Sequence, residues 1–121
     1  MTVKPTVAGA MPVMLGYWVI VAALIYATLA GTGGTLIYPL DDTYIHMAMA
    51  KNMAVHGVWG VTAEQFTSAT SSPLWTGVMA ATYAAFGVSN WAPLAVNLVI
   101  GTAVVLLLCG VLAHAGLSPM V

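Results

Sequence analysis

Most side chains that could transfer a proton or bind an anion lie in one stretch of this chain, residues 38–72. The acidic, basic and imidazole groups of this stretch are Asp41, Asp42, His46, Lys51, His56 and Glu64. Of the five charged residues in the sequence, only Lys4 lies elsewhere. A carboxylate can accept a proton, whereas a lysine or a histidine can donate hydrogen bonds to a phosphate. This stretch is therefore where function should be sought.

A helix is expected to position these groups. Residues 43–56 include no glycine or proline and are rich in alanine and methionine, which favours a helix. Asp42 suits the N-cap position, and Gly57 suits the left-handed position that follows a helix. At helical spacing, His46 and His56 share one side with apolar residues. The pattern predicts a helix over residues 43–56 that lies at a membrane surface or packs under protein.

The composition is that of an integral membrane protein. The sequence is 61% hydrophobic and 4% charged, with a mean hydropathy of +0.99, whereas a soluble domain carries about 25% charged residues. A net charge of -1 provides no basic patch, which excludes nucleic acid as a partner. Cys109 is the only cysteine, so no disulfide framework exists. The chain is long enough for about three spans.

Three apolar runs are expected to be transmembrane helices. The predicted segments are an N-terminal tail (1–13), a first span with its exit (14–37), an extramembrane loop (38–72), a second span (73–87), a third span (92–115) and a tail (116–121). The second run is short for a full span and suits a tilted or partly protein-buried helix. The predicted fold is therefore all-α and integral to the membrane, with a juxtamembrane helix in the loop between the first and second of three spans.

The positive-inside rule orients the chain. Lys4 on the short N-terminal tail places that tail in the cytoplasm and residues 38–72 outside. A secretory signal peptide ending near Ala30 is the competing interpretation of the first run. The run is longer than the apolar region of a signal peptide and further apolar segments follow, which favours an uncleaved anchor.

Four short segments, in this order, resemble a known enzyme family. They are Tyr38-Pro39-Leu40-Asp41-Asp42-Thr43-Tyr44-Ile45-His46, Ala50-Lys51-Asn52-Met53-Ala54, Gly57-Val58-Trp59 and Thr70-Ser71-Ser72-Pro73-Leu74-Trp75. They resemble the start of polytopic GT-C glycosyltransferases, in the bacterial branch akin to protein mannosyltransferases, aminoarabinose lipid A transferases and arabinofuranosyltransferases. In that family an acidic pair opens the first extracytoplasmic loop, a juxtamembrane helix with a basic-Asn pair follows, and a Ser/Thr-Pro-Leu-Trp-like stretch begins the second span.

The resemblance implies transfer of a sugar from a polyprenyl-phosphate carrier to an extracytoplasmic acceptor, at the outer face of a bacterial inner (plasma) membrane. The acceptor hydroxyl needs a carboxylate to take its proton, and the departing phosphate needs a cation or a metal. Asp41 or Asp42 would be the catalytic base, with the other as a metal ligand or orienting group. A divalent metal ion is thus a candidate cofactor. Lys51, His46 and His56 are the candidate substrate-binding residues for the phosphate.

Structural roles could explain some of the same residues. Asp42 could serve only as a helix cap, although capping would leave Asp41 unexplained. His46 and His56 suit interface positions better than a metal pair. Thr67 to Ser72 suits a solvated loop, with binding of sugar hydroxyls or phosphate as the alternative.

Two functions from different classes therefore remain. GT-C enzymes contain more spans and a second acidic loop, so the chain is expected to be an N-terminal segment that is inactive alone. Besides the lipid bilayer and the sugar donor, its expected partners are further transmembrane helices. The alternative is a small non-catalytic membrane protein, such as an assembly subunit or a transporter component.

Overall fold

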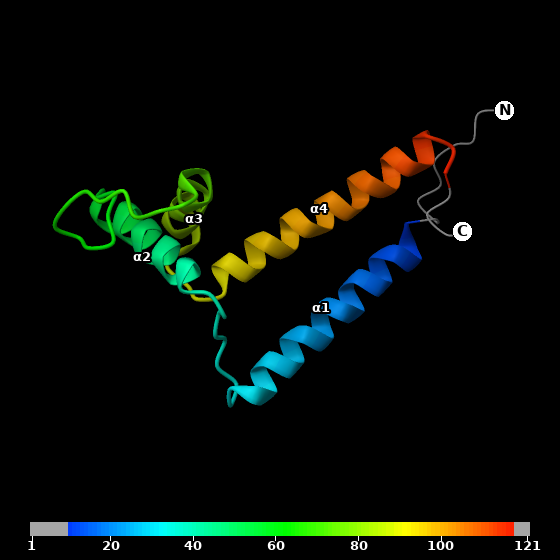
Figure 1. Ribbon diagram of the computed structural model, residues 1–121, viewed down its shortest axis with the longest axis horizontal. Coiled ribbons are helices and arrows are strands. Elements are labelled where there is room, and N and C mark those ends of the chain that lie inside the picture. The colour runs from blue at the N-terminus through cyan, green and yellow to red at the C-terminus, as the bar shows by residue number, and fades with distance from the viewer. Residues whose placement is uncertain (1–9, 118–121) are drawn as a thin grey trace. The chain divides into compact units, whose positions relative to one another are not determined.

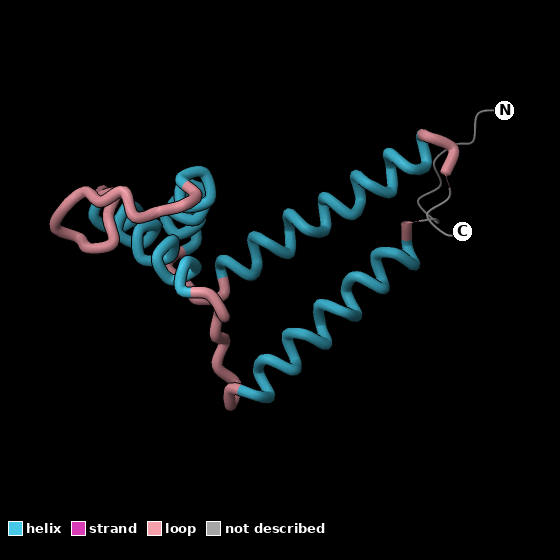
Figure 2. The backbone as a smooth tube through the Cα atoms, viewed as in Figure 1, coloured by secondary structure: helices cyan, strands magenta, loops and turns pink. Residues whose placement is uncertain are grey.

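The computed structural model describes residues 10–117, and these residues form four α-helices and no strand (Figures 1 and 2). The helices are α1 (Met11–Gly31), α2 (Asp41–His56), α3 (Pro73–Phe86) and α4 (Ala92–His114). This confirms the all-helical class. Lys4, most of the predicted N-terminal tail and residues 118–121 lie outside the described residues. Contacts divide the chain into two units, one of residues 1–35 and 96–121 and one of residues 36–95.

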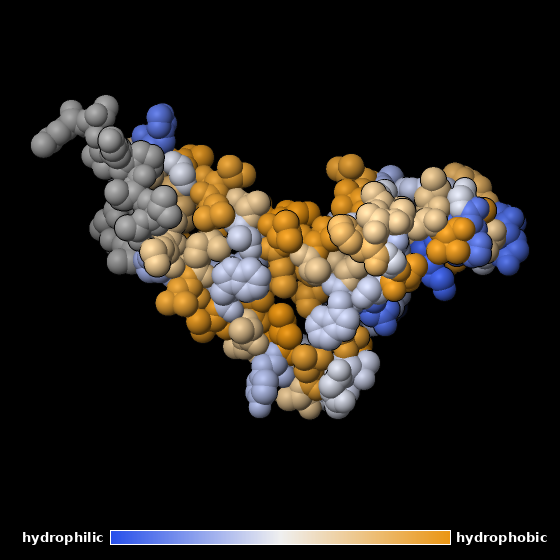
Figure 3. All heavy atoms as spheres, turned by 180° about the vertical axis from the view of Figure 1, so that it is seen from behind, coloured by the Kyte–Doolittle hydropathy of each residue, from blue (hydrophilic) through white to orange (hydrophobic). Residues whose placement is uncertain are grey.

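Two helices, α1 and α4, are long and apolar enough to cross a membrane. They contain 21 and 23 residues, which at ~1.5 Å per residue exceeds the ~30 Å of a hydrocarbon core. Neither contains Asp, Glu, Lys or Arg, and almost none of their surface is buried within the protein. On the face that Figure 3 shows, hydrophobic residues predominate over the long helices, whereas the most hydrophilic residues gather toward α2 and the loop after it.

Within the first unit, α1 and α4 approach each other at Tyr17 and Gly101. A Cβ atom added to Gly101 would lie 2.5 Å from the hydroxyl oxygen of Tyr17. A glycine is therefore the residue that lets the Tyr17 ring lie against α4. Small residues allow the same close approach between helices in membranes.

Within the second unit, α2 and α3 pack against each other. Each contributes small or flexible apolar side chains to the contact, and the buried ones are Met49 and Ala50 from α2 with Met79, Ala80 and Tyr83 from α3. Because methionine adapts to irregular gaps and alanine permits close approach, this pair forms a tight core without large aliphatic residues. Figure 1 shows α2 and α3 joined by the long loop over residues 57–72.

Helix α2 is the helix predicted over residues 43–56, but it begins two residues earlier. Leu40 occupies the N-cap position with an extended backbone, and no side chain caps the helix. The expectation that Asp42 is the N-cap is therefore wrong, and Asp41 and Asp42 both lie in the first turn. Negative charge there is favoured by the helix dipole. The left-handed conformation expected of Gly57 is confirmed, with a φ of 69°.

Helix α3 corresponds to the predicted second span, and it is too short to cross a bilayer without tilting or local thinning. Its 14 residues span about 21 Å, against ~30 Å for the hydrocarbon core. Only α1 and α4 of the four described helices meet the length and apolarity requirement. Two candidate spans are thus present where three were expected.

The segment that leaves α1 is joined to the turn that enters α4. The Tyr38 hydroxyl donates a hydrogen bond to the carbonyl of Asn90 (2.7 Å) and accepts one from the backbone N–H of Leu94 (3.2 Å). The backbone N–H of Tyr38 in turn donates to the hydroxyl of Tyr44 (3.0 Å). All of these residues belong to the second unit, which therefore holds both of its ends together.

The loop after α2 folds back onto that helix through Asn52. Its side-chain amide, in a buried residue, donates hydrogen bonds to the carbonyls of Gly60 (2.9 Å) and Val61 (2.8 Å). Thr67 closes the loop by accepting from the Val61 N–H and donating its own N–H to the carbonyl of Trp59, both at 3.0 Å. The chain then returns toward the start of α2, where the site lies.

Candidate functional site

The two predicted catalytic acids lie at the start of α2 with exposed side chains. Successive side chains leave an α-helix about 100° apart, so Asp41 and Asp42 face different directions. Asp42 shares its side of the helix with His46, one turn later. Because neither carboxylate makes a capping hydrogen bond, both keep acceptor capacity for another partner.

Asp42 has a hydrogen-bonding neighbour in the segment before α3. The hydroxyl of Ser71 donates to Oδ2 of Asp42 at 3.3 Å. This bond joins residues 29 positions apart in the sequence and brings the start of α3 to the start of α2. Among the described residues it is the only side-chain hydrogen bond of this carboxylate, and it leaves Oδ1 available. The geometry suits a carboxylate that is oriented from one side and open on the other.

His46 lies beneath this contact in a buried cluster of hydroxyl groups. The residue is 7% exposed, and its Nδ1 lies 2.9 Å from Oγ1 of Thr70 and 3.0 Å from Oγ1 of Thr76. The two hydroxyl oxygens are 2.8 Å apart. Thr76 lies on the face of α3 that packs against α2 and is fully buried. The cluster therefore ties α2, the loop and α3 together through polar atoms, directly beside Asp42.

The other two predicted substrate-binding residues lie far from the acids. Lys51 and His56 are exposed on α2, nine and fourteen residues beyond Asp42. At ~1.5 Å per residue, these intervals place their backbones about 14 and 21 Å along the helix axis. Of the three candidates for phosphate binding, the fold thus brings only His46 beside the acids.

A divalent metal ion would find only part of a site here. In residues 10–117 no group of three or more His, Cys, Asp or Glu side chains lies together. Mg²⁺ is commonly held by one or two protein carboxylates with substrate phosphates and waters completing the coordination. Because Asp41 and Asp42 face different directions, either one alone would supply that minimal donor set, and further ligands would come from the substrate or from other chain segments.

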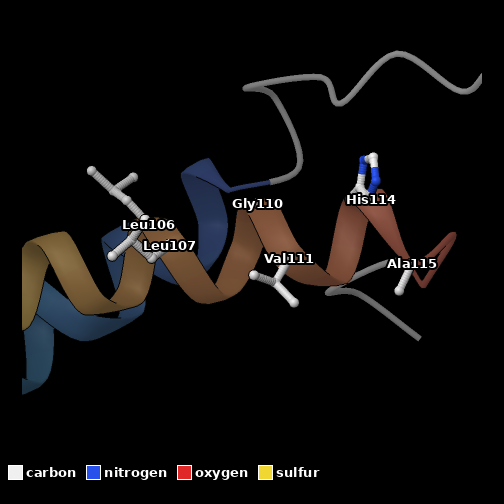
Figure 4. A pocket seen from close by; sticks show the side chains of 6 residues that line it. All are labelled: Leu106, Leu107, Gly110, Val111, His114 and Ala115. Carbon is white, nitrogen blue, oxygen red and sulfur yellow. The ribbon is translucent and has the colours of Figure 1, made fainter.

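A pocket in the other unit does not belong to this site. It lies along the last turns of α4 and is lined by Leu106, Leu107, Gly110, Val111, His114 and Ala115 (Figure 4). His114 is the one titratable side chain among these residues. Its walls come from a single helix and the residue after it, so it lacks groups on a second element that could hold a polar substrate.

Thr70, Ser71 and Thr76 were not predicted as site residues. Thr70 and Ser71 fall in the stretch expected to be a solvated loop, and Thr76 falls in the predicted second span. One sequence signal could have indicated a buried partner. His46 shares its helix side with apolar residues, and a polar group on a buried face requires a hydrogen-bond partner.

The chain was compared with protein-family models, with curated proteins and with solved structures, and it matches none of them. The likeness of residues 38–75 to GT-C enzymes therefore rests on the residues quoted above.

Proposed function

We propose that this chain forms the acid-bearing, N-terminal part of a membrane glycosyltransferase that uses a polyprenyl-phosphate sugar at the outer membrane surface. One observation carries the proposal most directly. Two carboxylates begin a helix without capping it, ten residues after a helix of membrane-spanning length ends, and one of them is held by a neighbouring hydroxyl. Further transmembrane helices, in the same polypeptide or in a partner, would complete the site.

We also propose that the chain crosses the membrane twice, through α1 and α4, and not three times. A crossing by α3 would put the segment after α1 and the turn before α4 on opposite sides of the bilayer. The hydrogen bonds of Tyr38 to Asn90 and Leu94 join these two segments directly. The same side of the membrane would then hold all of residues 36–95, with α2 and α3 both juxtamembrane and outside, and the N-terminus in the cytoplasm.

In this proposal Asp42 takes the proton of the acceptor hydroxyl through its available carboxylate oxygen. The acceptor oxygen forms a bond to the anomeric carbon of the sugar as the bond from that carbon to the phosphate oxygen breaks. The proton ends on the carboxylate, and the polyprenyl phosphate leaves with the electron pair of the broken bond. A bound divalent metal ion would supply charge stabilisation to that phosphate.

The distances along α2 limit what Lys51 and His56 can do. A carrier phosphate that reacts beside Asp42 would lie about one to two helix turns away from the ammonium group of Lys51, even with the lysine side chain extended. These two residues suit the headgroup region or a more distant part of the donor. The cation that meets the reacting phosphate would therefore come from a metal or from the completing helices.

A non-catalytic membrane protein remains the second candidate, and one observation favours it. Acids in the first turn of a helix stabilise it by about 0.3–1 kcal/mol each through the helix dipole. Asp41 and Asp42 occupy such positions, so both could be present for helix stability alone. Under this alternative the negative charge of the two acids stabilises the helix, and neither acid takes a proton from a substrate.

Genetic complementation tests the proposal. In cells that lack the chain, variants Asp41→Asn, Asp42→Asn and the matched control Glu64→Gln are expressed, and sugar transfer from labelled polyprenyl-phosphate donors to extracytoplasmic acceptors is measured in isolated membranes. Glu64 is an exposed loop carboxylate, so its variant removes one charge outside the site. The proposal predicts that at least one Asp variant inserts normally and loses transfer, while the control retains it. Full transfer with both Asp variants would favour the non-catalytic alternative.

A further inference from the structure

The hydroxyl cluster around His46 fixes which ring nitrogen carries a proton. The Thr76 hydroxyl lies 3.1 Å from the carbonyl of Ser72, which can only accept, and every contact in the cluster is a hydrogen bond only if Thr76 donates its single proton there. Thr76 Oγ1 is then an acceptor toward both Thr70 and His46. His46 must donate through Nδ1–H if its 3.0 Å contact with Thr76 is a hydrogen bond. With a bare Nδ1, Thr76 would make that contact only by giving up its hydrogen bond to the carbonyl of Ser72.

The same assignment of protons to donors makes every other contact in the cluster a hydrogen bond. Thr70 donates its hydroxyl proton to Thr76 and accepts from the backbone N–H of Ser72 at 3.1 Å. The Nδ1–H of His46 is shared between the two threonine oxygens, 2.9 and 3.0 Å away. In the neutral ring Nε2 is then an acceptor, which cannot donate to a phosphate. In its neutral form the buried ring is thus committed through Nδ1 to the protein and offers an anionic ligand no donor.

This cluster holds the backbone that delivers Ser71 to Asp42. Thr70 and Ser72 flank Ser71, and both are fixed by it: Thr70 through its side chain, Ser72 through its N–H and its carbonyl. The hydroxyl of Ser71 is thereby presented to Oδ2 of Asp42. Removing the Nδ1–H donor would take away one of the bonds that hold Thr70 and would loosen the position of Ser71 beside the carboxylate.

We infer that His46 is a positioning residue, which acts through Thr70 and Ser71 to aim the Asp42 carboxylate, and not a ligand of the donor phosphate. The inference rests on the proposed function, because the orientation of the Asp42 carboxylate affects the rate only if Asp42 acts in the transfer. A carboxylate displaced by about 1 Å from a productive position can lose up to about 100-fold in rate.

Two amide substitutions separate the roles of the two ring nitrogens. The side-chain amide of asparagine reaches the position of Nδ1, and that of glutamine reaches the position of Nε2. His46→Asn therefore keeps the donor to Thr70 and Thr76, whereas His46→Gln loses it and offers a group near Nε2. Thr70→Val removes the relaying hydroxyl with little change of shape, and His114→Asn, at the far end of α4, is the matched control.

Transfer kinetics and backbone hydrogen exchange are measured on these variants in membranes that contain the complete system. The expected result is a loss of about 10- to 100-fold in kcat with little change in donor KM for His46→Gln and Thr70→Val. His46→Asn and His114→Asn should remain within about threefold of wild type, which is a loss of less than one kcal/mol. The Ser72 amide should exchange faster in the two impaired variants and at the native rate in His46→Asn.

The opposite ranking would overturn the inference. Activity in His46→Gln with loss in His46→Asn would mean that Nε2 contacts the substrate. Native kinetics in all variants would mean that the hydroxyl cluster around His46 has no role in transfer. Asp42→Asn is measured alongside, since full activity of that variant would defeat the transferase proposal itself. A native exchange rate of the Ser72 amide in His46→Gln would show that His46 does not hold this segment, whatever the activity shows.

Discussion

The hydroxyl of Tyr38 donates a 2.7 Å hydrogen bond to the backbone carbonyl of Asn90, 52 residues further along the chain. This one side chain joins the segment after α1 to the turn before α4, and it also accepts from the N–H of Leu94. An N–H in the first turn of a helix has no partner within that helix. Tyr38 therefore supplies an acceptor for the Leu94 N–H and joins the two ends of the unit that carries the acids.

Replacing Tyr38 by Phe should destabilise this unit. The variant loses two hydrogen bonds and leaves the Leu94 N–H without its partner, at a cost of about 1–3 kcal/mol. Thermal unfolding of the purified chain in mild detergent should show a lower midpoint. Tyr26→Phe is the control, because Tyr26 is 75% exposed on α1 and its hydroxyl makes no hydrogen bond among the described residues. Equal midpoints for the two variants would contradict the bridging role of Tyr38.

Alkaline pH should weaken the same unit. Burial raises the pKa of the Tyr38 hydroxyl above its usual value of 10.0, with the Leu94 hydrogen bond opposing and the neighbouring Tyr44 adding to the shift. A raised pKa means that the folded state favours the neutral phenol, so this stability is present below pH 10.0 and is lost as the pH rises through the raised value. Unfolding midpoints measured across this range should fall more steeply in wild type than in Tyr38→Phe.

Two glycine substitutions should have opposite effects on stability. Gly57→Ala should destabilise the chain by about 1–2 kcal/mol, because the left-handed backbone at this position disfavours a Cβ atom. Gly77→Ala should stabilise it by about 0.5–1 kcal/mol, since Gly77 lies inside α3 and an added Cβ meets nothing within 4 Å. Denaturation in detergent provides the measurement. Stabilisation by Gly57→Ala would show that the end of α2 is not held as described.

The approach of α1 and α4 at Tyr17 and Gly101 should appear as a coupled pair of mutations. Gly101→Ala should lose most or all of the gain of about 0.5–1 kcal/mol that alanine brings inside a helix, because the new Cβ would lie 2.5 Å from the Tyr17 hydroxyl oxygen and displace that side chain. Tyr17→Phe removes that oxygen, so the double variant should recover most of the loss. Gly110→Ala, where a Cβ meets nothing within 4 Å, is the control. Simple additivity of the two single effects would mean that these helices do not meet there.

The helices could largely be predicted from local sequence, because their signals are local. The absence of glycine and proline from residues 43–56 and the left-handed Gly57 after them locate α2. Its start could not be placed as well, since Leu40 adopts the extended N-cap conformation and leaves the two acids inside the first turn.

The polar cluster and the packing of α3 depend on contacts between distant residues. His46 meets Thr70 and Thr76 across 24 and 30 residues, and no local pattern indicates which hydroxyls a buried histidine will reach. The apolar character of α3 predicted a span, and composition alone does not distinguish a lipid-facing helix from one that packs on a neighbour. Its burial of Thr76, Met79 and Tyr83 against α2 is visible only in the folded unit.

The sidedness of Leu40 and Ser89 tests the central claim most directly, because one residue precedes the acids and the other lies in the turn between α3 and α4. Leu40→Cys and Ser89→Cys are made in a Cys109→Ala background and treated in intact cells with a membrane-impermeant maleimide. The two-span proposal, with the acids outside, predicts that both cysteines are labelled without permeabilisation. Labelling of Ser89→Cys only after permeabilisation would mean that α3 crosses the membrane. Labelling of Leu40→Cys only after permeabilisation would place Asp41 and Asp42 in the cytosol and contradict the transferase proposal.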